Sequence, residues 1–392
     1  MKTNAYARDL VEPTMAPLAS YRQCTRQPVV RAKLARQLRC ACVRSCVGHA
    51  REHARALAWL LLVLLGSVCL QPPPSLAEPV VIKFATLAPE GTPWMNTMED
   101  MNRELQEKSA GQISFRFYAG GVAGDEHDVL GKMRSNQLQG GAFSGFSLGA
   151  VVPEVRVFEL PLLFHTAAEV DSVATALFEH FATALAQKGF ILLDLHEAGA
   201  IYIFSKIPIR TSADMARAKI WTWQGDPLPE AIFQAYGIAP VPLPLSKVLP
   251  SLQAGLIDAC YGTPLTVLAL QWSPKLKYRT ALPLTHVLGA LLLSDSLWRQ
   301  LSAEQQTLVR DTVRKFNAKA AANMQQYETK ALTLLQTTAG IETVTVPEEE
   351  VARLQQVSEQ VRQELIDKLY PRTLLERVLA LRDAYRQTHK QE

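Results

Sequence analysis

Ser147 lies in the pattern Gly145-Phe-Ser-Leu-Gly149, which matches the G-x-S-x-G turn that presents the nucleophile of many serine hydrolases. That chemistry needs a strand before the serine, a helix directly after it and a histidine to take its proton. Pro153 follows closely and interrupts a helix within about a turn. A serine hydrolase is therefore only the alternative hypothesis. The spacing prefers none of the candidate bases His165, His180, His196 and His286.

The histidines and cysteines indicate neither a metal centre nor a disulfide framework. The six histidines after residue 77 show no pair at metal-ligand spacing. Asp125-Glu-His-Asp128 is a polar cluster, but acidic residues in the first turn of a helix are favoured by the helix dipole. Five of the six cysteines lie before residue 78, so only Cys260 remains in the rest of the chain. The sequence contains no P-loop and no dinucleotide-binding fingerprint, and we expect no cofactor.

Aromatic residues give the strongest chemical signal. Trp221 and Trp223 are two residues apart on a predicted strand, so their side chains share one face. Two adjacent indoles can be core packing or the wall of a ligand site, and both interpretations stay open. Gly225-Asp-Pro227 ends the strand just beyond them, and ligands of open α/β sheets bind beyond the carboxyl ends of strands. Three more aromatic residues could face the same site: Tyr202, Tyr261 and Trp272.

The excess of basic residues behind the net charge of +4 is confined to the N-terminal part of the 392-residue chain. Residues 1–77 hold 11 Lys and Arg against 3 Asp and Glu, so residues 78–392 hold 30 basic and 34 acidic residues. This balance argues against a nucleic-acid-binding surface. An arginine-rich stretch, a 15-residue apolar run (56–70) and Ser75-Leu-Ala77 predict a signal peptide that is cleaved after Ala77. We therefore expect an exported protein.

The elements that would position these residues follow an α/β pattern. An apolar run at 79–86 predicts a buried strand, and Trp94, Met98, Met101 and Leu105 have helical spacing. A strand at Ile113–Tyr118 and a helix at 125–137 continue the order β-α-β-α, which is typical of a sheet covered by helices. Later strands are predicted at Phe190–Leu195, Ala200–Ser205, Lys219–Trp223 and His286–Ser294.

A long helix is predicted near the C-terminus. Apolar residues recur at threes and fours from Val309 to Leu334, after a capping box at Ser302 and Gln305 and before Gly340. About 36 residues at ~1.5 Å each give ~54 Å, which is longer than one small domain. A chain of 392 residues favours two lobes over one core. We therefore expect this helix to lie across both lobes.

Residues 80–370 resemble the DctP-type periplasmic solute-binding subunits of TRAP transporters. Each matching stretch is weak alone, but their order and spacing together are specific. They are Ile82-Lys-Phe-Ala-Thr-Leu-Ala-Pro89, the Gly-x-x-Gly-Asp-Glu run from Gly121, Glu159-Leu-Pro-Leu-Leu-Phe164, Pro208-Ile with Lys219-Ile, Pro240-Val-Pro-Leu-Pro-Leu-Ser246, and Leu252-Gln-Ala-Gly-Leu-Ile-Asp258-Ala.

The resemblance implies a two-lobed periplasmic binding protein of the type II kind, without enzymatic activity. Its lobes are joined by crossing strands and braced by the long helix. It would capture a small ligand between the lobes and deliver it to a small and a large membrane subunit, and we expect a monomer rather than a dimer. The predicted first lobe is 78–199 with 287–330, the second is 200–286 with 331–370, and 371–392 form a C-terminal tail. A sensor that keeps the fold but does not transport is a further hypothesis, which a side-chain-filled cleft would favour.

The chain departs from the family pattern at the positions with which the family binds ligand carboxylates. The arginine that normally clamps a carboxylate falls on Trp221, and a second arginine would fall near Ile201 or Tyr202. The usual asparagine falls on Gly262, and the usual glutamate on Lys247. Because a buried carboxylate without a partner is costly, we predict an apolar, aromatic or neutral ligand. A cation with Glu90 or Asp226 as counter-charge, or an anion at Lys247, are the alternatives.

The predicted ligand contacts come from both lobes. The first lobe supplies the loop before the first helix and a glycine-rich turn. The second lobe supplies the aromatic residues and the end of one strand. The full predicted set is Glu90, Thr92, Phe143, Ser144, Phe146, Tyr202, Trp221, Trp223, Tyr261, Gly262 and Trp272.

Overall fold

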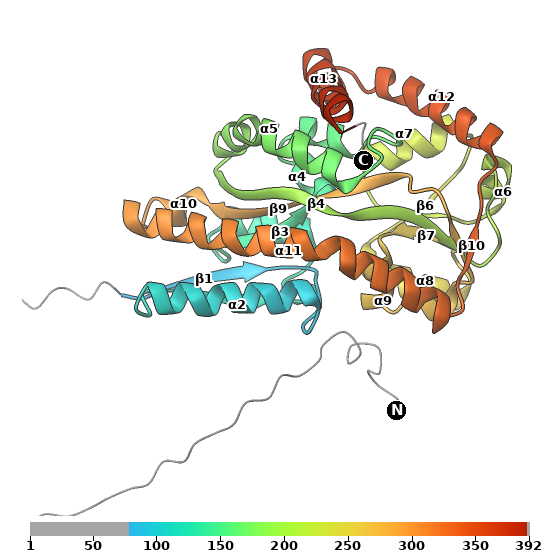
Figure 1. Cartoon of the computed structure of the whole chain (residues 1–392). Helices are drawn as coiled ribbons and strands as arrows, with labels where there is room; N and C mark the ends of the chain where they lie inside the picture. The colour runs from blue at the N-terminus through green and yellow to red at the C-terminus, as the bar shows by residue number, and fades with distance from the viewer. Residues whose placement is uncertain (1–77, 390–392) are drawn as a thin grey trace, which may run out of the picture. The chain divides into compact units, whose positions relative to one another are not determined.

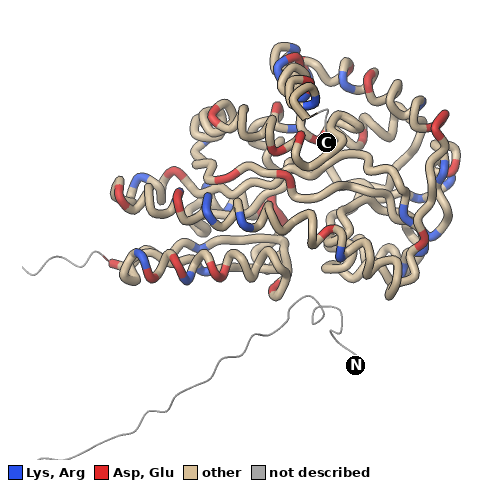
Figure 2. Tube along the Cα trace, viewed as in Figure 1, with Lys and Arg blue, Asp and Glu red and all other residues tan. Residues whose placement is uncertain are grey.

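A computed structural model describes residues 78–389. The predicted signal peptide and its cleavage after Ala77 lie outside the described residues. Within the described part, no helix combines the length and the apolar character that crossing a membrane requires. Figure 2 shows basic and acidic residues interspersed along the helices α2 (Pro93–Lys108) and α11 (Ala303–Thr337), rather than gathered by sign.

The first lobe is built on a mixed sheet with the strand order β2-β1-β3-β9-β4. β1 pairs in parallel with β2 and β3, whereas β9 runs antiparallel between β3 and β4. The predicted β-α-β-α order is present, because α2 and α3 connect these first strands. The elements are β1 (Val80–Ala85), β2 (Ile113–Tyr118), α3 (Glu126–Arg134), β3 (Gly140–Ser144), α4 (Gly145–Gly149), η1 (Pro153–Glu159), α5 (Ala167–Ala186), β4 (Phe190–Ser205), β9 (Thr285–Ser294) and α10 (Asp295–Trp298).

The second lobe is built on the C-terminal half of β4. This half pairs antiparallel with β7 and β8, β10 joins β8 in parallel, and β5 and β6 form a separate parallel pair. The elements are α6 (Ser212–Arg217), β5 (Trp221–Trp223), α7 (Pro227–Ala235), β6 (Val241–Leu243), η2 (Leu245–Lys247), α8 (Val248–Ala254), β7 (Ala259–Gly262), α9 (Pro264–Ala269), η3 (Ser273–Lys275), β8 (Tyr278–Thr280), β10 (Glu342–Val344) and α12 (Glu348–Glu364).

Two strands and one helix cross between the lobes. β4 is a single strand of 16 residues where the sequence predicts two, and its pairing with β9 is irregular between Glu197 and Ala200. α11 has 35 residues, starts with the predicted capping box at Ser302, and contacts both α2 and α9 (Figure 1). The prediction of a long helix that spans both lobes is confirmed. α13 (Arg372–Thr388), within the predicted tail, is a helix that contacts α5.

A half-buried acid, Glu328, lies at the crossing. Gly199 of β4 has a φ of +123°, and a Cβ there would lie 2.8 Å from the Glu328 carboxylate of α11. Burial, followed by the neighbouring charge of Glu197, raises the pKa of Glu328 to about 8. Oε1 of Glu197 lies 2.7 Å from Nδ1 of the buried His286 of β9, within hydrogen-bond distance. The crossing strands and the long helix therefore meet at titratable side chains.

Glu328 makes the stability of the protein depend on pH. Its carboxyl keeps a proton in the folded state up to a pKa of about 8 but loses it near 4.5 when unfolded. Stability therefore falls as the pH rises from about 4.5 to about 8, by at most about 1.4 kcal/mol per pH unit. Urea unfolding at several pH values should show that Glu328→Gln makes this slope shallower, because other buried carboxyl groups with a raised pKa contribute the remainder. The exposed Glu304 of the same helix provides the control, because Glu304→Gln should leave the slope above pH 5, roughly, unchanged.

Candidate ligand-binding site

The predicted aromatic residues of the second lobe form one contact network. The Trp221 ring stacks on Tyr261 with 4.8 Å between centroids, and meets Trp272 edge to face at 5.8 Å. The Trp221 and Trp223 centroids are 6.0 Å apart, as expected for residues that share one face of β5. The main-chain N–H of Trp223 donates to the Tyr261 hydroxyl at 3.2 Å. β5 and β7 thus bring these aromatic side chains together within one apolar cluster of the second lobe.

The network extends from the core of the second lobe to the first lobe. Trp221 and Trp272 are each only 2% exposed, and the Trp221 indole donates to the Leu243 carbonyl at 2.9 Å, so both serve the core. Trp223 is half-buried and contacts Phe146 of α4 with 4.9 Å between ring centroids. Trp223 is therefore the member of the network that touches both lobes.

A buried charge cluster lies at the same junction and was not found from the sequence. Arg156 of η1 is 4% exposed, and its Nη2 donates to both carboxylate oxygens of Asp226, at 3.0 and 2.9 Å. Its Nη1 lies 2.7 Å from a carboxylate oxygen of Glu159. Asp226 follows β5 and caps α7 by accepting from the Leu228 N–H at 3.1 Å. The ion pair thus joins the first lobe to the second.

The glycines of the G-x-S-x-G pattern make room for this cluster. A Cβ at Gly145 would lie 2.4 Å from the Glu159 carboxylate, and one at Gly149 would lie 2.6 Å from Cδ of Arg156. Ser147 is fully buried and donates its hydroxyl proton to the Glu126 carboxylate, not to a histidine. The pattern therefore holds buried side chains in place, and the geometry gives the hydrolase alternative no support.

Glu126 adds a further carboxyl group beside α4. It accepts from the Ser144 N–H at 3.1 Å and from the Ser144 hydroxyl at 2.6 Å, in addition to the Ser147 hydroxyl. Desolvation raises the pKa of Glu126, and also of Glu159 and Asp226. Three buried carboxyl groups therefore accompany the single guanidinium of Arg156, and the junction is acid-rich.

The structure places the other predicted residues in different surroundings. Glu90 is exposed, and Thr92 caps α2 by accepting from Met95 N–H at 3.4 Å. Phe143 is 3% exposed within the first-lobe core. Tyr202 lies beneath the Arg279 guanidinium at 4.5 Å and pairs across strands with Gly262. The five residues that the structure joins into one network are Phe146, Trp221, Trp223, Tyr261 and Trp272.

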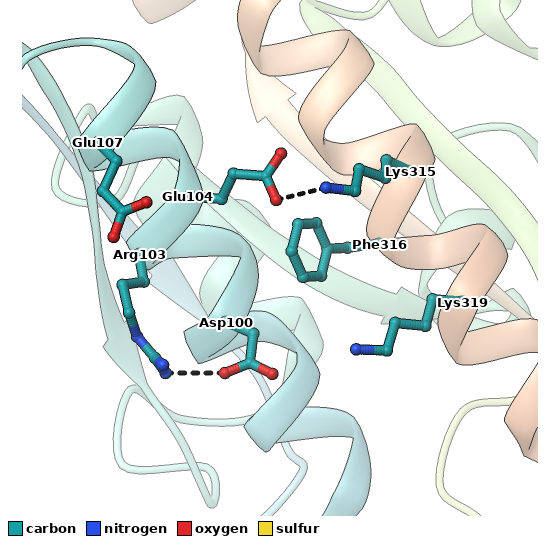
Figure 3. A pocket seen from close by; sticks show the side chains of 7 residues that line it. All are labelled: Asp100, Arg103, Glu104, Glu107, Lys315, Phe316 and Lys319. Carbon is teal, nitrogen blue, oxygen red and sulfur yellow. Dashed lines mark hydrogen bonds and ion pairs between the residues drawn. The ribbon is translucent and has the colours of Figure 1, made fainter.

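Two hollows lie away from this network. One, of about 420 Å³, lies between α2 and α11 and is lined by charged side chains around Phe316 (Figure 3). There Lys315 pairs with Glu104, and Arg103 pairs with Asp100. The other is narrow and is lined by residues such as Ile203, Met215 and Leu354. Neither includes any of the predicted ligand contacts, and the two lobes touch directly at the aromatic network.

Replacing a glycine that faces the charge cluster should destabilise the protein. Gly149→Ala puts a Cβ against the Arg156 side chain and should lower the free energy of unfolding by about 1–3 kcal/mol, measured by urea denaturation. Gly131 of α3 is the matched control, because a Cβ there meets nothing within 4 Å. Gly131→Ala should raise stability by about 0.5–1 kcal/mol. Equal effects of both substitutions would contradict the close packing of the Arg156 side chain against Gly149.

Known proteins are similar to this chain in sequence and fold. Residues 84–369 match the model of DctP, the bacterial extracellular solute-binding proteins of family 7. A solute-binding protein of Chromohalobacter salexigens is 28% identical over 172 residues, which are 43% of this chain and 51% of that protein. The ectoine-binding periplasmic protein TeaA of Halomonas elongata is 27% identical over 203 residues, 50% of this chain and 58% of TeaA. The match thus spans little more than half the length of these two relatives.

A solved structure matches a larger part of the chain than these two relatives do. The TRAP periplasmic solute-binding protein of Pseudomonas putida F1, with bound D-glucuronate, is 26% identical with a TM-score of 0.69, over 76% of this chain and 96% of that one. The two-lobed α/β fold with its long helix is therefore that of a periplasmic binding protein. Because the family model matches well over half of the chain, the protein belongs to the bacterial extracellular solute-binding proteins of family 7.

Proposed function

We propose that this protein is the periplasmic solute-binding subunit of a TRAP-type transporter, which captures a small ligand between its lobes and delivers it to membrane subunits. The family match, the two lobes and the crossing strands support this role. We place the first lobe at 78–199 with 287–330 and the second at 200–286 with 331–370. Release and capture require these lobes to separate at the contact between Phe146 and Trp223.

The ligand that we propose is aromatic, apolar or neutral rather than a simple carboxylate. The observation that carries this proposal is the state of Arg156, the buried arginine at the junction, which already faces Asp226 and Glu159. A ligand carboxylate there would be a further anion beside one cation. Trp221, which the family resemblance places where the clamping arginine would lie, offers only an indole whose N–H donates to the Leu243 carbonyl.

The ligands named for two relatives can be compared with the ligand class proposed here. The Pseudomonas putida protein was solved with D-glucuronate, a sugar acid, and TeaA is named for binding ectoine. In this chain the half-buried Trp223, beside Phe146 and Tyr261, offers the aromatic surface on which a planar neutral ligand can stack. The cation alternative has weaker support, because Asp226 is engaged by Arg156 and Glu90 is an exposed loop residue. Lys247 is also exposed, as expected for a solvated lysine.

A sensor or scaffold without cargo is the second candidate. The direct contact between Phe146 and Trp223 and the ion pair between Arg156 and Asp226 favour it, because side chains meet where a ligand would lie. The two candidates differ in one observable property. A transport receptor carries or binds a small molecule saturably, whereas a scaffold does not.

The ligand class can be tested on the exported protein. Native mass spectrometry of the protein purified from its own periplasm, followed by ligand extraction, should detect an aromatic or neutral compound. Calorimetric titration should then show that Trp223→Ala weakens its binding by at least about tenfold, the loss expected when an aromatic stacking contact is removed. Trp94→Ala, at a half-buried tryptophan of α2, should leave the affinity unchanged. Tight binding of a dicarboxylate, keto acid or sugar acid to the wild type would refute the proposed ligand class, and absence of any ligand would favour the scaffold.

A further inference from the structure

We propose that Asp226 is a built-in carboxylate that occupies Arg156 in place of a ligand acid, and that this pair both closes the lobes and excludes carboxylate ligands. The inference rests on the proposed function, which it deepens by naming the residues that determine ligand class. It concerns Arg156, which the sequence analysis did not identify, and Asp226, which it named only as a counter-charge for a cationic ligand.

The first step is the chemistry of Arg156. A guanidinium presents a planar set of N–H donors that suits a carboxylate better than any other partner in a protein. Nη2 of Arg156 holds both oxygens of Asp226, and Nη1 lies against Glu159. Its Nε is buried and has no hydrogen-bond partner among residues 78–389. The Arg156 guanidinium can thus donate a further hydrogen bond at the junction, although neighbouring carboxylates already balance its charge.

The second step is where the Asp226 carboxylate comes from. Arg156 belongs to η1 of the first lobe, whereas Asp226 follows β5 and begins α7 in the second lobe. The next residue but one, Leu228, joins the same apolar cluster as Val157 and Phe158 of η1. A ligand acid held between two lobes would connect them in the same way. Asp226 makes this connection as part of the chain, directly beside Trp223.

The third step is the charge that surrounds the pair. Arg156 faces two carboxylates, and the nearby Glu126 supplies another buried carboxyl group. A ligand acid would have to displace Asp226, which would leave a carboxylate buried without its cation, or approach as an additional anion. Both are unfavourable in a desolvated site. The pair therefore acts against acids, whereas a neutral ligand meets no such penalty.

Removing the Asp226 side chain gives a direct test, because acetate is chemically the group that is removed. In Asp226→Gly the backbone can still begin α7, since glycine is a tolerated N-cap, and Arg156 keeps Glu159 as a partner. We expect the melting temperature of this variant to fall, and acetate to restore it saturably. At ten times its dissociation constant, acetate should raise the melting temperature by about 3 °C relative to chloride at equal ionic strength.

Three controls make the acetate effect specific. Asp125→Gly removes another N-cap aspartate, at α3, that contacts no arginine, and should show no acetate effect. Asp226→Asn fills the position with a neutral group and should also show none. The double variant Asp226→Gly with Arg156→Met should lose the acetate effect of the single variant. An acetate effect of similar size in the wild type or in Asp125→Gly would overturn the proposal.

A second measurement keeps the test decisive if Asp226→Gly does not fold. Asp226→Asn retains the size and the capping ability of the side chain but not its charge. Small-angle X-ray scattering should show a larger radius of gyration for this variant than for the wild type, because the lobes lose their ionic contact. A folded Asp226→Asn variant as compact as the wild type would refute the closing role of the pair.

The outcomes separate this inference from the proposed function. If the wild type binds only neutral ligands and Asp226→Gly does not respond to acetate, the inference fails and the proposed ligand class stands. If the wild type itself binds glucuronate and Arg156→Met abolishes this binding, the proposed ligand class fails as well. An acetate-responsive Asp226→Gly variant beside an acid-indifferent wild type supports both.

Discussion

A guanidinium that is removed from water must be neutralised where it lies, and this constraint organises the junction between the two lobes. Arg156 is buried beneath α4, so the chain places Glu159 three residues later and brings Asp226 from the other lobe. Gly145 and Gly149 follow from the same constraint, because any Cβ there would occupy the space of these side chains. The capped start of α7 is fixed in turn, since Asp226 serves both Arg156 and the Leu228 N–H.

The aromatic network and the charge cluster complement one another at this junction. The aromatic side chains fill the volume beside β5 and give Trp223 a position against Phe146. The ion pair fixes how η1 and α7 lie against each other, because one donor group of Arg156 binds both carboxylate oxygens of Asp226. Apolar contacts alone hold two surfaces together without specifying one geometry. The combination favours a single closed arrangement of the lobes.

Local patterns predicted the parts of the fold that depend on local physics. The 35-residue helix α11 followed from its apolar period and its capping box at Ser302, and the shared face of Trp221 and Trp223 followed from strand alternation. Arg156 was missed because nothing in a stretch such as Pro153–Glu159 distinguishes a buried arginine from a solvated one. Its burial depends on Asp226, 70 residues away, and only tertiary structure brings them together. The two glycines flanking Ser147 were misleading for the same reason.

The pair also explains why such an arrangement persists once it has formed. Loss of Asp226 alone leaves Arg156 underneutralised, and loss of Arg156 alone leaves two acids buried together, each a destabilising change of about 3–5 kcal/mol for a fully buried pair. That is a large part of the stability of an ordinary domain. Acid binding through Arg156 would therefore require a ligand carboxylate to arrive as Asp226 departs. Until that happens, the shape of the aromatic site is free to vary, because the aromatic residues do not have to neutralise a charge.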